Sequence, residues 1–174
     1  MKKDIIQKAK NFHGHLGPFL VLGLKMGTYA KEYIKPKDFK EMSAVVLINP
    51  LKTPESCAID GIQFSSCCTT GKCNLIVKEK DSPGIECIFK GNNRMIKITV
   101  KDMALGVIKH KLSDHNHHYH DHSLDHHDTF DPLHQEDIIH HQHFHDHGSV
   151  EDVAYEIIGL DFDALFYYEC KEIK

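Results

Sequence analysis

The spacing of apolar residues predicts two helices at the start of the chain. Apolar residues recur at helical intervals over residues 4–12, a segment that ends before Gly14. A longer apolar stretch predicts a second helix over residues 18–34, with a proline at its first position and another just beyond its end. This helix contains Gly23 and Gly27, one turn apart. Because each glycine costs a helix about 1 kcal/mol, we expect another backbone to pack closely against this face.

The middle of the chain alternates between short apolar runs and turn-forming residues, a pattern typical of a sheet. Strands are predicted over residues 43–48, 75–78, 85–89 and 95–100. The last three are separated by turns rich in Gly, Asn, Asp and Pro, so we expect them to form an antiparallel meander. Between the first strand and the second, a helix is predicted to begin at Pro54, with Thr53 as its N-cap.

Helical and strand patterns return near the end of the chain. Residues 150–158 have an apolar helical face preceded by a capping-box pattern at Ser149 and Asp152, and residues 164–173 have a strand-like, aromatic-rich pattern. This order of elements favours a single α+β domain with N-terminal helices packed on a mostly antiparallel sheet. The expected organisation is an α+β core over residues 1–110, an insertion over residues 111–148 and closing elements over residues 149–174.

The expected insertion is rich in His and Asp. Fourteen of the 16 histidines lie between His110 and His147. Residues 112–148 carry a charge of −8, which leaves +4 for the rest of a chain with a net charge of −4. The segment has few aliphatic residues to bury, so it is expected to be mobile.

Neutral imidazoles bind nickel, zinc, copper and cobalt, and aspartates attract cations, so this composition predicts weak, exchangeable metal sites. A solvated polar loop without a ligand is the simpler alternative. The histidines expected to contribute are His115, His117, His118, His120, His122, His126, His127, His140, His141, His143, His145 and His147.

Charge and hydropathy argue against several partners. No basic stripe with interleaved aromatic residues is present in the sequence, so nucleic acid is not an expected partner. The longest apolar stretch is too short to span a bilayer, and the first residues have no signal-peptide pattern. We therefore expect a cytoplasmic protein with no membrane partner. Its six cysteines are expected to be reduced, which disfavours a disulfide framework.

Four of the six cysteines lie close together, at Cys57, Cys67, Cys68 and Cys73. Cys57 falls near the predicted start of a helix, where the helix dipole is expected to lower the pKa of its thiol, and Asp60 lies on the same face. A metal or reactive-thiol site is favoured, while a small buried side chain is the commoner role of a single free cysteine. The spacing fits neither a Walker phosphate loop nor a zinc ribbon. An incomplete set of thiol ligands suits a catalytic or exchangeable metal.

Two histidines, His13 and His15, flank Gly14 just before the second predicted helix. Histidines on such a turn can converge on an ion, or they can be polar turn residues that cap the helix. Candidates for a catalytic role are Cys57, Asp60 and Lys72, but the sequence leaves open whether the chain catalyses a reaction.

Three motifs together resemble the FmdE family of formylmethanofuran dehydrogenase components, found in methanogenic archaea and some anaerobic bacteria. They are F-H-G-H-L-G-P at residues 12–18, C-A-I-D-G-I-Q at residues 57–63 and S-C-C-T-T-G-K-C-N-L at residues 66–75. The resemblance covers about residues 1–110 and the closing helix and strand. It implies an α+β core, usually dimeric, with a metal site in a cleft. The matching positions are His13, His15, Cys57, Asp60, Gln63, Cys68, Thr69, Gly71 and Lys72.

The chain departs from the family pattern in three ways. Cys67 and Cys73 stand where the family has glycines, which either adds thiol ligands or alters the turn. The zinc finger that some members carry is missing from the sequence, and the His-rich insertion is not part of the family core. The pterin and iron–sulfur cofactors of the dehydrogenase lie on other subunits, and nothing in this sequence resembles their folds, so the resemblance does not imply the catalytic activity.

Three functions remain open on this basis. The first is binding of a transition metal ion, zinc or nickel, by His13, His15, Cys57 and Cys68, in an accessory to methanogenic CO2 reduction or a small metalloenzyme. The second is a carrier or store of nickel, zinc or cobalt, acting through the His-rich segment and serving a metal-dependent apo-protein. The third is a thiol redox sensor that uses Cys67 and Cys68. The expected partners are a second copy of the chain and other subunits of the dehydrogenase.

Overall fold

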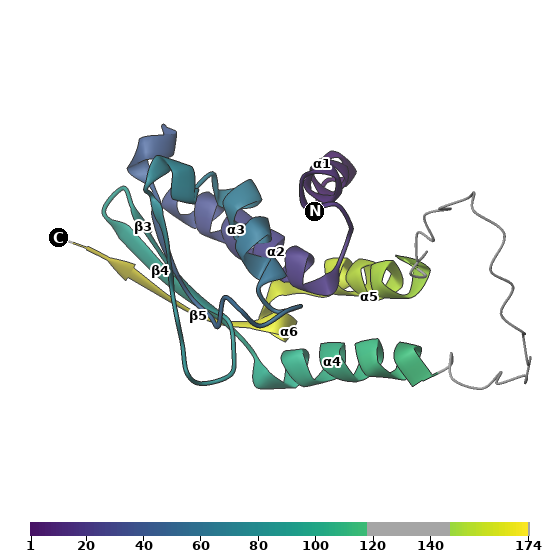
Figure 1. The fold of residues 1–174 in the computed structure, drawn as a ribbon. Helices are drawn as coiled ribbons and strands as arrows, with labels where there is room; N and C mark the ends of the chain where they lie inside the picture. Colours follow the sequence, from purple (N-terminus) through teal and green to yellow (C-terminus); the bar gives the residue numbers. More distant parts are fainter. Residues whose placement is uncertain (118–146, 174) are drawn as a thin grey trace, which may run out of the picture.

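A computed structural model describes residues 1–117 and 147–173, with side chains up to residue 113 and from residue 150. Its helices are α1 (Lys3–His13), α2 (Pro18–Ile34), α3 (Cys57–Ser66), α4 (Asp102–His117), α5 (His147–Gly159) and α6 (Phe162–Leu165). Its strands are β1 (Ser43–Leu47), β2 (Leu75–Lys78), β3 (Glu86–Gly91), β4 (Arg94–Val100) and β5 (Phe166–Glu172). The helices lie against a single five-stranded sheet (Figure 1), which confirms the predicted α+β domain. None of the described helices is long and apolar enough to cross a membrane.

The sheet is mostly antiparallel, with the strand order β2-β1-β3-β4-β5. The strands β1, β3, β4 and β5 pair antiparallel in turn, and Asn92 and Asn93 form the β3–β4 turn with positive φ angles. The predicted three-strand meander is wrong for β2. This strand does not pair with β3 but runs parallel to β1, because the chain crosses over through α3 between them.

The core of the protein is built around α2. Most of its residues are buried, and it packs against β3 and β4 on one side and α3 on another. The predicted close approach at the glycines is confirmed. A Cβ atom at Gly23 would lie under 3.0 Å from the backbone of Ala58 in α3, and one at Gly61 in α3 would lie equally close to the backbone of Leu20. The two helices run in the same direction, since Gly23 faces the start of α3 and Gly27 faces its end at Ser65.

The start of α3 differs from the sequence prediction. The helix begins at Cys57 with Ser56 as its N-cap, not at Pro54 with Thr53 as its cap. Residues 49–56 instead form turns, and the N–H of Cys57 donates to the carbonyl of Pro54 at 3.1 Å. Cys57 therefore occupies the first helical position.

A helix lies on each side of the predicted insertion: α4 precedes it and α5 follows it. Helix α4 was not predicted, and it extends beyond residue 111, where the insertion was expected to start. Helix α5 is described from His147 onward, so the capping-box pattern at Ser149 lies within the helix and does not mark its start. The two helices run antiparallel (Figure 1), and the side chains of Lys111 and Glu156 form an ion pair between them. Most of the predicted metal-binding histidines, from His118 to His145, lie outside the described residues.

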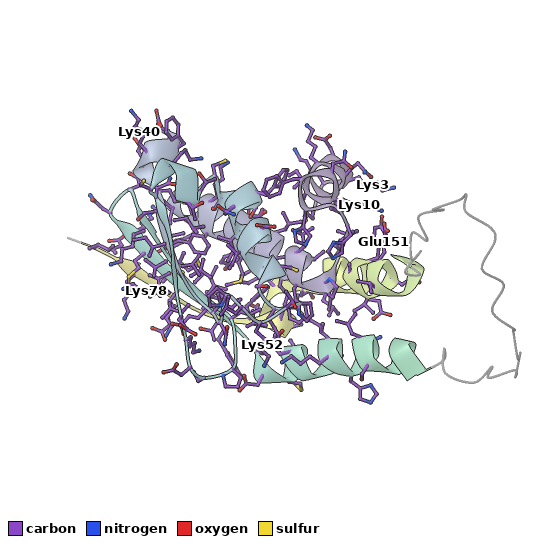
Figure 2. The ribbon with its side chains drawn as sticks, viewed as in Figure 1. Lys3, Lys10, Lys40, Lys52, Lys78 and Glu151 are labelled. Carbon is purple, nitrogen blue, oxygen red and sulfur yellow. The ribbon has the colours of Figure 1, made fainter. Side chains whose placement is uncertain are left out.

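The first helix is attached by both apolar and polar contacts, and its residues Ile6 and Ala9 are buried in the core. The ammonium of Lys10 donates to both carboxylate oxygens of Glu151 in α5, at 2.8 and 2.7 Å, and the two residues lie close together in Figure 2. The ring of Phe12 lies 6.0 Å from that of Phe64 in α3. These contacts hold the end of α1, and with it the turn at Gly14, over the start of α2.

The close packing of α2 and α3 generates a stability prediction. Gly23→Ala should lower the free energy of unfolding by about 1–3 kcal/mol, because the added methyl group forces the two backbones apart. Gly106→Ala is the matched control, since Gly106 is also helical but a Cβ there would meet nothing within 4 Å. It should leave stability unchanged or raise it by up to about 1 kcal/mol. Chemical denaturation would measure both variants, and equal effects would contradict the packing argument.

Candidate functional site

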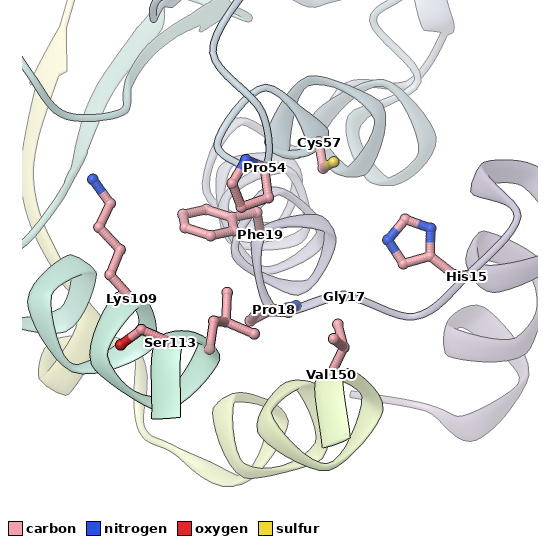
Figure 3. A pocket seen from close by; sticks show the side chains of 10 residues that line it. His15, Gly17, Pro18, Phe19, Pro54, Cys57, Lys109, Ser113 and Val150 are labelled. Atoms are coloured by element: carbon pink, nitrogen blue, oxygen red, sulfur yellow. The ribbon is translucent and has the colours of Figure 1, made fainter. Parts of the chain in front are cut away.

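A cavity of about 560 Å³ opens where the starts of α2 and α3 meet α4 and α5 (Figure 3). His15 and Cys57 lie on one side of it, and Lys109 and Ser113 of α4 lie on the other. The other described residues that line it are apolar or glycine, and come from the first residues of α2, from Pro54, from Leu112 and from Val150. The fold therefore brings two motifs that are far apart in the sequence, at His15 and Cys57, to one cavity.

His13 lies beside this cavity at the end of α1. Its side chain is 10% exposed, and its Nδ1 atom lies 2.7 Å from Oδ2 of Asp60 in α3. The His13 and His15 rings are 4.7 Å apart, centre to centre. The Nε2 atom of His13 is buried and has no hydrogen-bond partner among the described residues. Since buried polar atoms are normally paired, this nitrogen marks a position where a ligand would be favourable.

Asp60 is held in place from its other side. The amide of Gln63 donates to Oδ1 of Asp60 at 3.4 Å, and the carbonyl oxygen of Gln63 accepts from the backbone N–H of Thr70 at 3.2 Å. A chain of hydrogen bonds thus runs from the loop after α3 through Gln63 and Asp60 to His13. This chain fixes the orientation of the His13 ring.

Cys57 is half-buried at the start of α3. Burial raises the pKa of its thiol above the ordinary value, and the carboxylate of Asp60 raises it further. The expectation of a lowered pKa is therefore wrong, because desolvation and a neighbouring acid outweigh the helix dipole. The free thiol is protonated at neutral pH.

The second half of the cysteine cluster forms a structural turn. Cys68 is fully buried in the core, where its thiol donates to the carbonyl of Met42 at 3.5 Å. Asn74 accepts from the N–H of Thr69 at 2.9 Å and donates to the carbonyls of Phe39 and Met42. Cys68 does not line the cavity, so the structure does not bring it together with His15 and Cys57.

Cys67 and Cys73 both adopt left-handed backbone conformations, with φ angles of 62° and 57°. Glycine adopts this conformation without a steric cost, which explains glycine at both positions in the family pattern. The Cys67 thiol lies 3.6 Å from the ammonium of Lys31, and the Cys73 side chain is exposed. The role of Cys67 and Cys68 in redox sensing stays a prediction.

The remaining predicted residues lie apart from the cavity. Lys72 is exposed on the short 3-10 helix Thr70–Lys72, with its ammonium 5.7 Å from the centre of the Phe39 ring. Thr69 caps this helix by accepting from the N–H of Lys72. In the part of the chain that the structure describes, no three His, Cys, Asp or Glu side chains are arranged as a complete metal site.

Sequence reasoning missed the residues that α4 and α5 contribute to the cavity. Lys109, Leu112 and Val150 come from helices on either side of the His-rich segment. The spacing of Leu105, Ile108 and Leu112 is helical, and this signal would have predicted a helix after residue 100.

These features define a class of α+β protein with a largely apolar cavity and a histidine–carboxylate pair beside it. The family model described as "FmdE, Molybdenum formylmethanofuran dehydrogenase operon" matches residues 12–137, and the chain belongs to this family. A probable S-adenosyl-L-methionine-binding protein of Archaeoglobus fulgidus is 29% identical over 100 residues, which cover 51% of this chain and 27% of that protein. The chain thus matches about a quarter of the length of that relative.

The left-handed turn generates a prediction about the departures from the family pattern. Cys73→Gly should leave the free energy of unfolding unchanged or raise it by up to about 1 kcal/mol, because glycine removes the steric cost at a positive φ. Cys170→Gly is the control, since Cys170 is an exposed cysteine in the extended strand β5. It should lower stability by about 0.5–1 kcal/mol. Thermal or chemical denaturation would measure both, and a destabilising Cys73→Gly would contradict a purely conformational role for this residue.

Proposed function

We propose that this protein binds a transition metal ion, zinc or nickel, at a site formed by His13, His15 and Cys57. The observation that carries the proposal is the buried Nε2 atom of His13, which has no hydrogen-bond partner among the described residues. With Asp60 accepting from Nδ1–H, the lone pair of the ring is on Nε2, which is the arrangement of a metal-binding histidine supported by a carboxylate. Leaving such an atom buried and unpaired costs about 1–3 kcal/mol, and an ion at Nε2 would remove that cost.

His15 and Cys57 supply the further donors. Imidazole nitrogen and thiolate sulfur are the donor types that zinc prefers, and nickel also binds imidazole. The three side chains do not form a complete site in the described geometry, so His15 and Cys57 would turn towards His13 when an ion binds. A bound ion would act as a Lewis acid at the edge of the cavity. Cys68 is left out of the proposed site because it donates to Met42 inside the core.

We further propose a role as a metal-binding accessory to formylmethanofuran dehydrogenase. Family membership supports this role, since the description of the family refers to the operon of that enzyme. The proposed partners are subunits of the enzyme. The structure of the cavity supports a role in binding a ligand. We assign no residue a catalytic role, so we do not propose that the protein catalyses a reaction of its own.

Substitutions of the site residues test the proposed metal site. His13→Gln and Cys57→Ser should each lower the amount of ion that survives dialysis against a weak chelator, measured by elemental analysis. Asp60→Asn should weaken binding about 10- to 100-fold, because it removes the carboxylate that orients His13. Cys73→Ser is the control, since it changes an exposed thiol outside the cavity. Retention of one ion per chain in all three site variants would refute the site.

A second candidate function is a metal carrier that acts through the His-rich segment. Its support is the composition, with 14 histidines between His110 and His147. The described helices on either side of this segment, α4 and α5, also contribute Leu112 and Val150 to the cavity. Ions held by the segment would therefore be tethered to the same end of the fold as the proposed core site.

Deletion of residues 118–146 tests the carrier function. The deletion should remove most weakly bound nickel or zinc in a calorimetric titration, and leave the tight site and the melting temperature unchanged. The weak binding of the full chain should be lost as the pH falls through about 6.5, because protonated imidazole cannot bind a metal. Equal stoichiometry with and without the segment would contradict the carrier function.

A further inference from the structure

We infer that β5 is an interface at which two copies of this chain pair edge to edge, antiparallel, with Cys170 of one copy opposite Cys170 of the other. No residue of β5 lines the cavity. The inference therefore goes beyond the proposed metal site and does not depend on it.

The backbone of β5 is open to a further strand. β5 is the last strand of the sheet (Figure 1), and among the described residues it pairs with β4 alone. The N–H of Ile173 donates to the carbonyl of Asn93 at 2.8 Å, and in an antiparallel pair the direction of these groups alternates along the strand. The N–H and C=O groups of Tyr168, Cys170 and Glu172 therefore point away from β4. Such a row of backbone groups is a template for another strand.

The side chains of β5 are also available to a partner. Every residue of this seven-residue strand after Phe166 is exposed, including Tyr167 at 65% and Tyr168 at 41%. The strand contains no proline, and its pairing with β4 continues without a bulge, so two common protections of a sheet edge are missing from it. Its charged side chains restrict the partner, because the second strand must place opposite charges against them.

The sequence of β5 is complementary to itself in one register. With a two-fold axis at Cys170, Glu169 of each copy lies opposite the partner's Lys171, and Tyr167 lies opposite the partner's Ile173. The symmetry makes each of these pairs occur twice. Opposite charges and apolar side chains that face each other across two strands stabilise the pairing.

The neighbouring registers are less favourable. An axis at Glu169 or at Lys171 would place two like charges directly opposite each other, which is destabilising. An axis at Tyr168 would leave Lys171 with no residue of β5 opposite it. Within one chain the Glu169 carboxylate and the Lys171 ammonium are 3.8 Å apart, with side chains 65% and 61% exposed, so this pair contributes little by itself and both groups remain accessible to a second copy.

Charge exchange tests the pairing and its register. The full chain should show a concentration-dependent monomer–dimer equilibrium in analytical ultracentrifugation. Lys171→Glu and Glu169→Lys should each weaken the dimer about tenfold or more, because both charge pairs become repulsive. An equimolar mixture of the two variants should dimerise again, since every Glu then faces a Lys of the partner.

Lys78→Glu is the matched control for this experiment. Lys78 is an exposed lysine on β2, the strand at the other edge of the same sheet. The variant should dimerise as the unmodified chain does. A chain that stays monomeric at all concentrations, a mixture that does not restore the dimer, or a dimer lost in Lys78→Glu would overturn the proposal.

Cross-linking of Cys170 tests the position of the axis. Hydrogen-bonded residues that face each other in an antiparallel pair have Cα atoms about 5.5 Å apart, so a short bis-maleimide should join the two Cys170 thiols. The cross-linked dimer should be lost in Cys170→Ser and kept in Cys73→Ser, which removes an exposed cysteine outside β5. A cross-link that persists in Cys170→Ser, or that does not form in the unmodified chain, would overturn the proposal.

Discussion

The contact between α2 and α3 is the constraint on which the rest of the structure depends. Glycines on both helices let the two backbones approach more closely than any side chain would allow. Because the helices run parallel, this contact also sets both N-terminal ends at the same place. That one packing arrangement determines where the cavity forms and where Cys57 lies. It also places Asp60 within hydrogen-bonding distance of His13.

Local patterns in the sequence predicted most of the elements, and they failed where the outcome depended on distant parts of the chain. The close approach at Gly23 and Gly27 could be inferred, because a glycine pair inside a helix needs a packing reason. The parallel pairing of β2 with β1 could not, because strand pairing is decided by the crossover and not by the strand itself. Helix α4 was missed because its second half merges into the His-rich composition, although its apolar spacing was readable.

The candidate site shows a similar division. The sequence singled out His13, Cys57 and Asp60, and the structure connects them through α1 and α3. It could not show that Cys68 points into the core, because four neighbouring thiols look alike until the turn is known. Nor could it give the pKa of Cys57, which depends on how much of the thiol is buried. The cysteine-rich segment therefore has two roles. Residues 57–63 supply the polar side chains of the candidate site, and residues 67–74 form the turn that leads into β2.

The antiparallel arrangement of α4 and α5 affects how much the length of the sequence between them can change. The helices are joined by the ion pair of Lys111 and Glu156, so the chain leaves and re-enters the fold at the same end. The entropic cost of closing a loop between such points rises by only about 0.6 kcal/mol for each doubling of its length. The connection between α4 and α5 is therefore a position at which sequence can be gained, lost or exchanged during evolution with little effect on the core, and most of the histidines of the chain lie there.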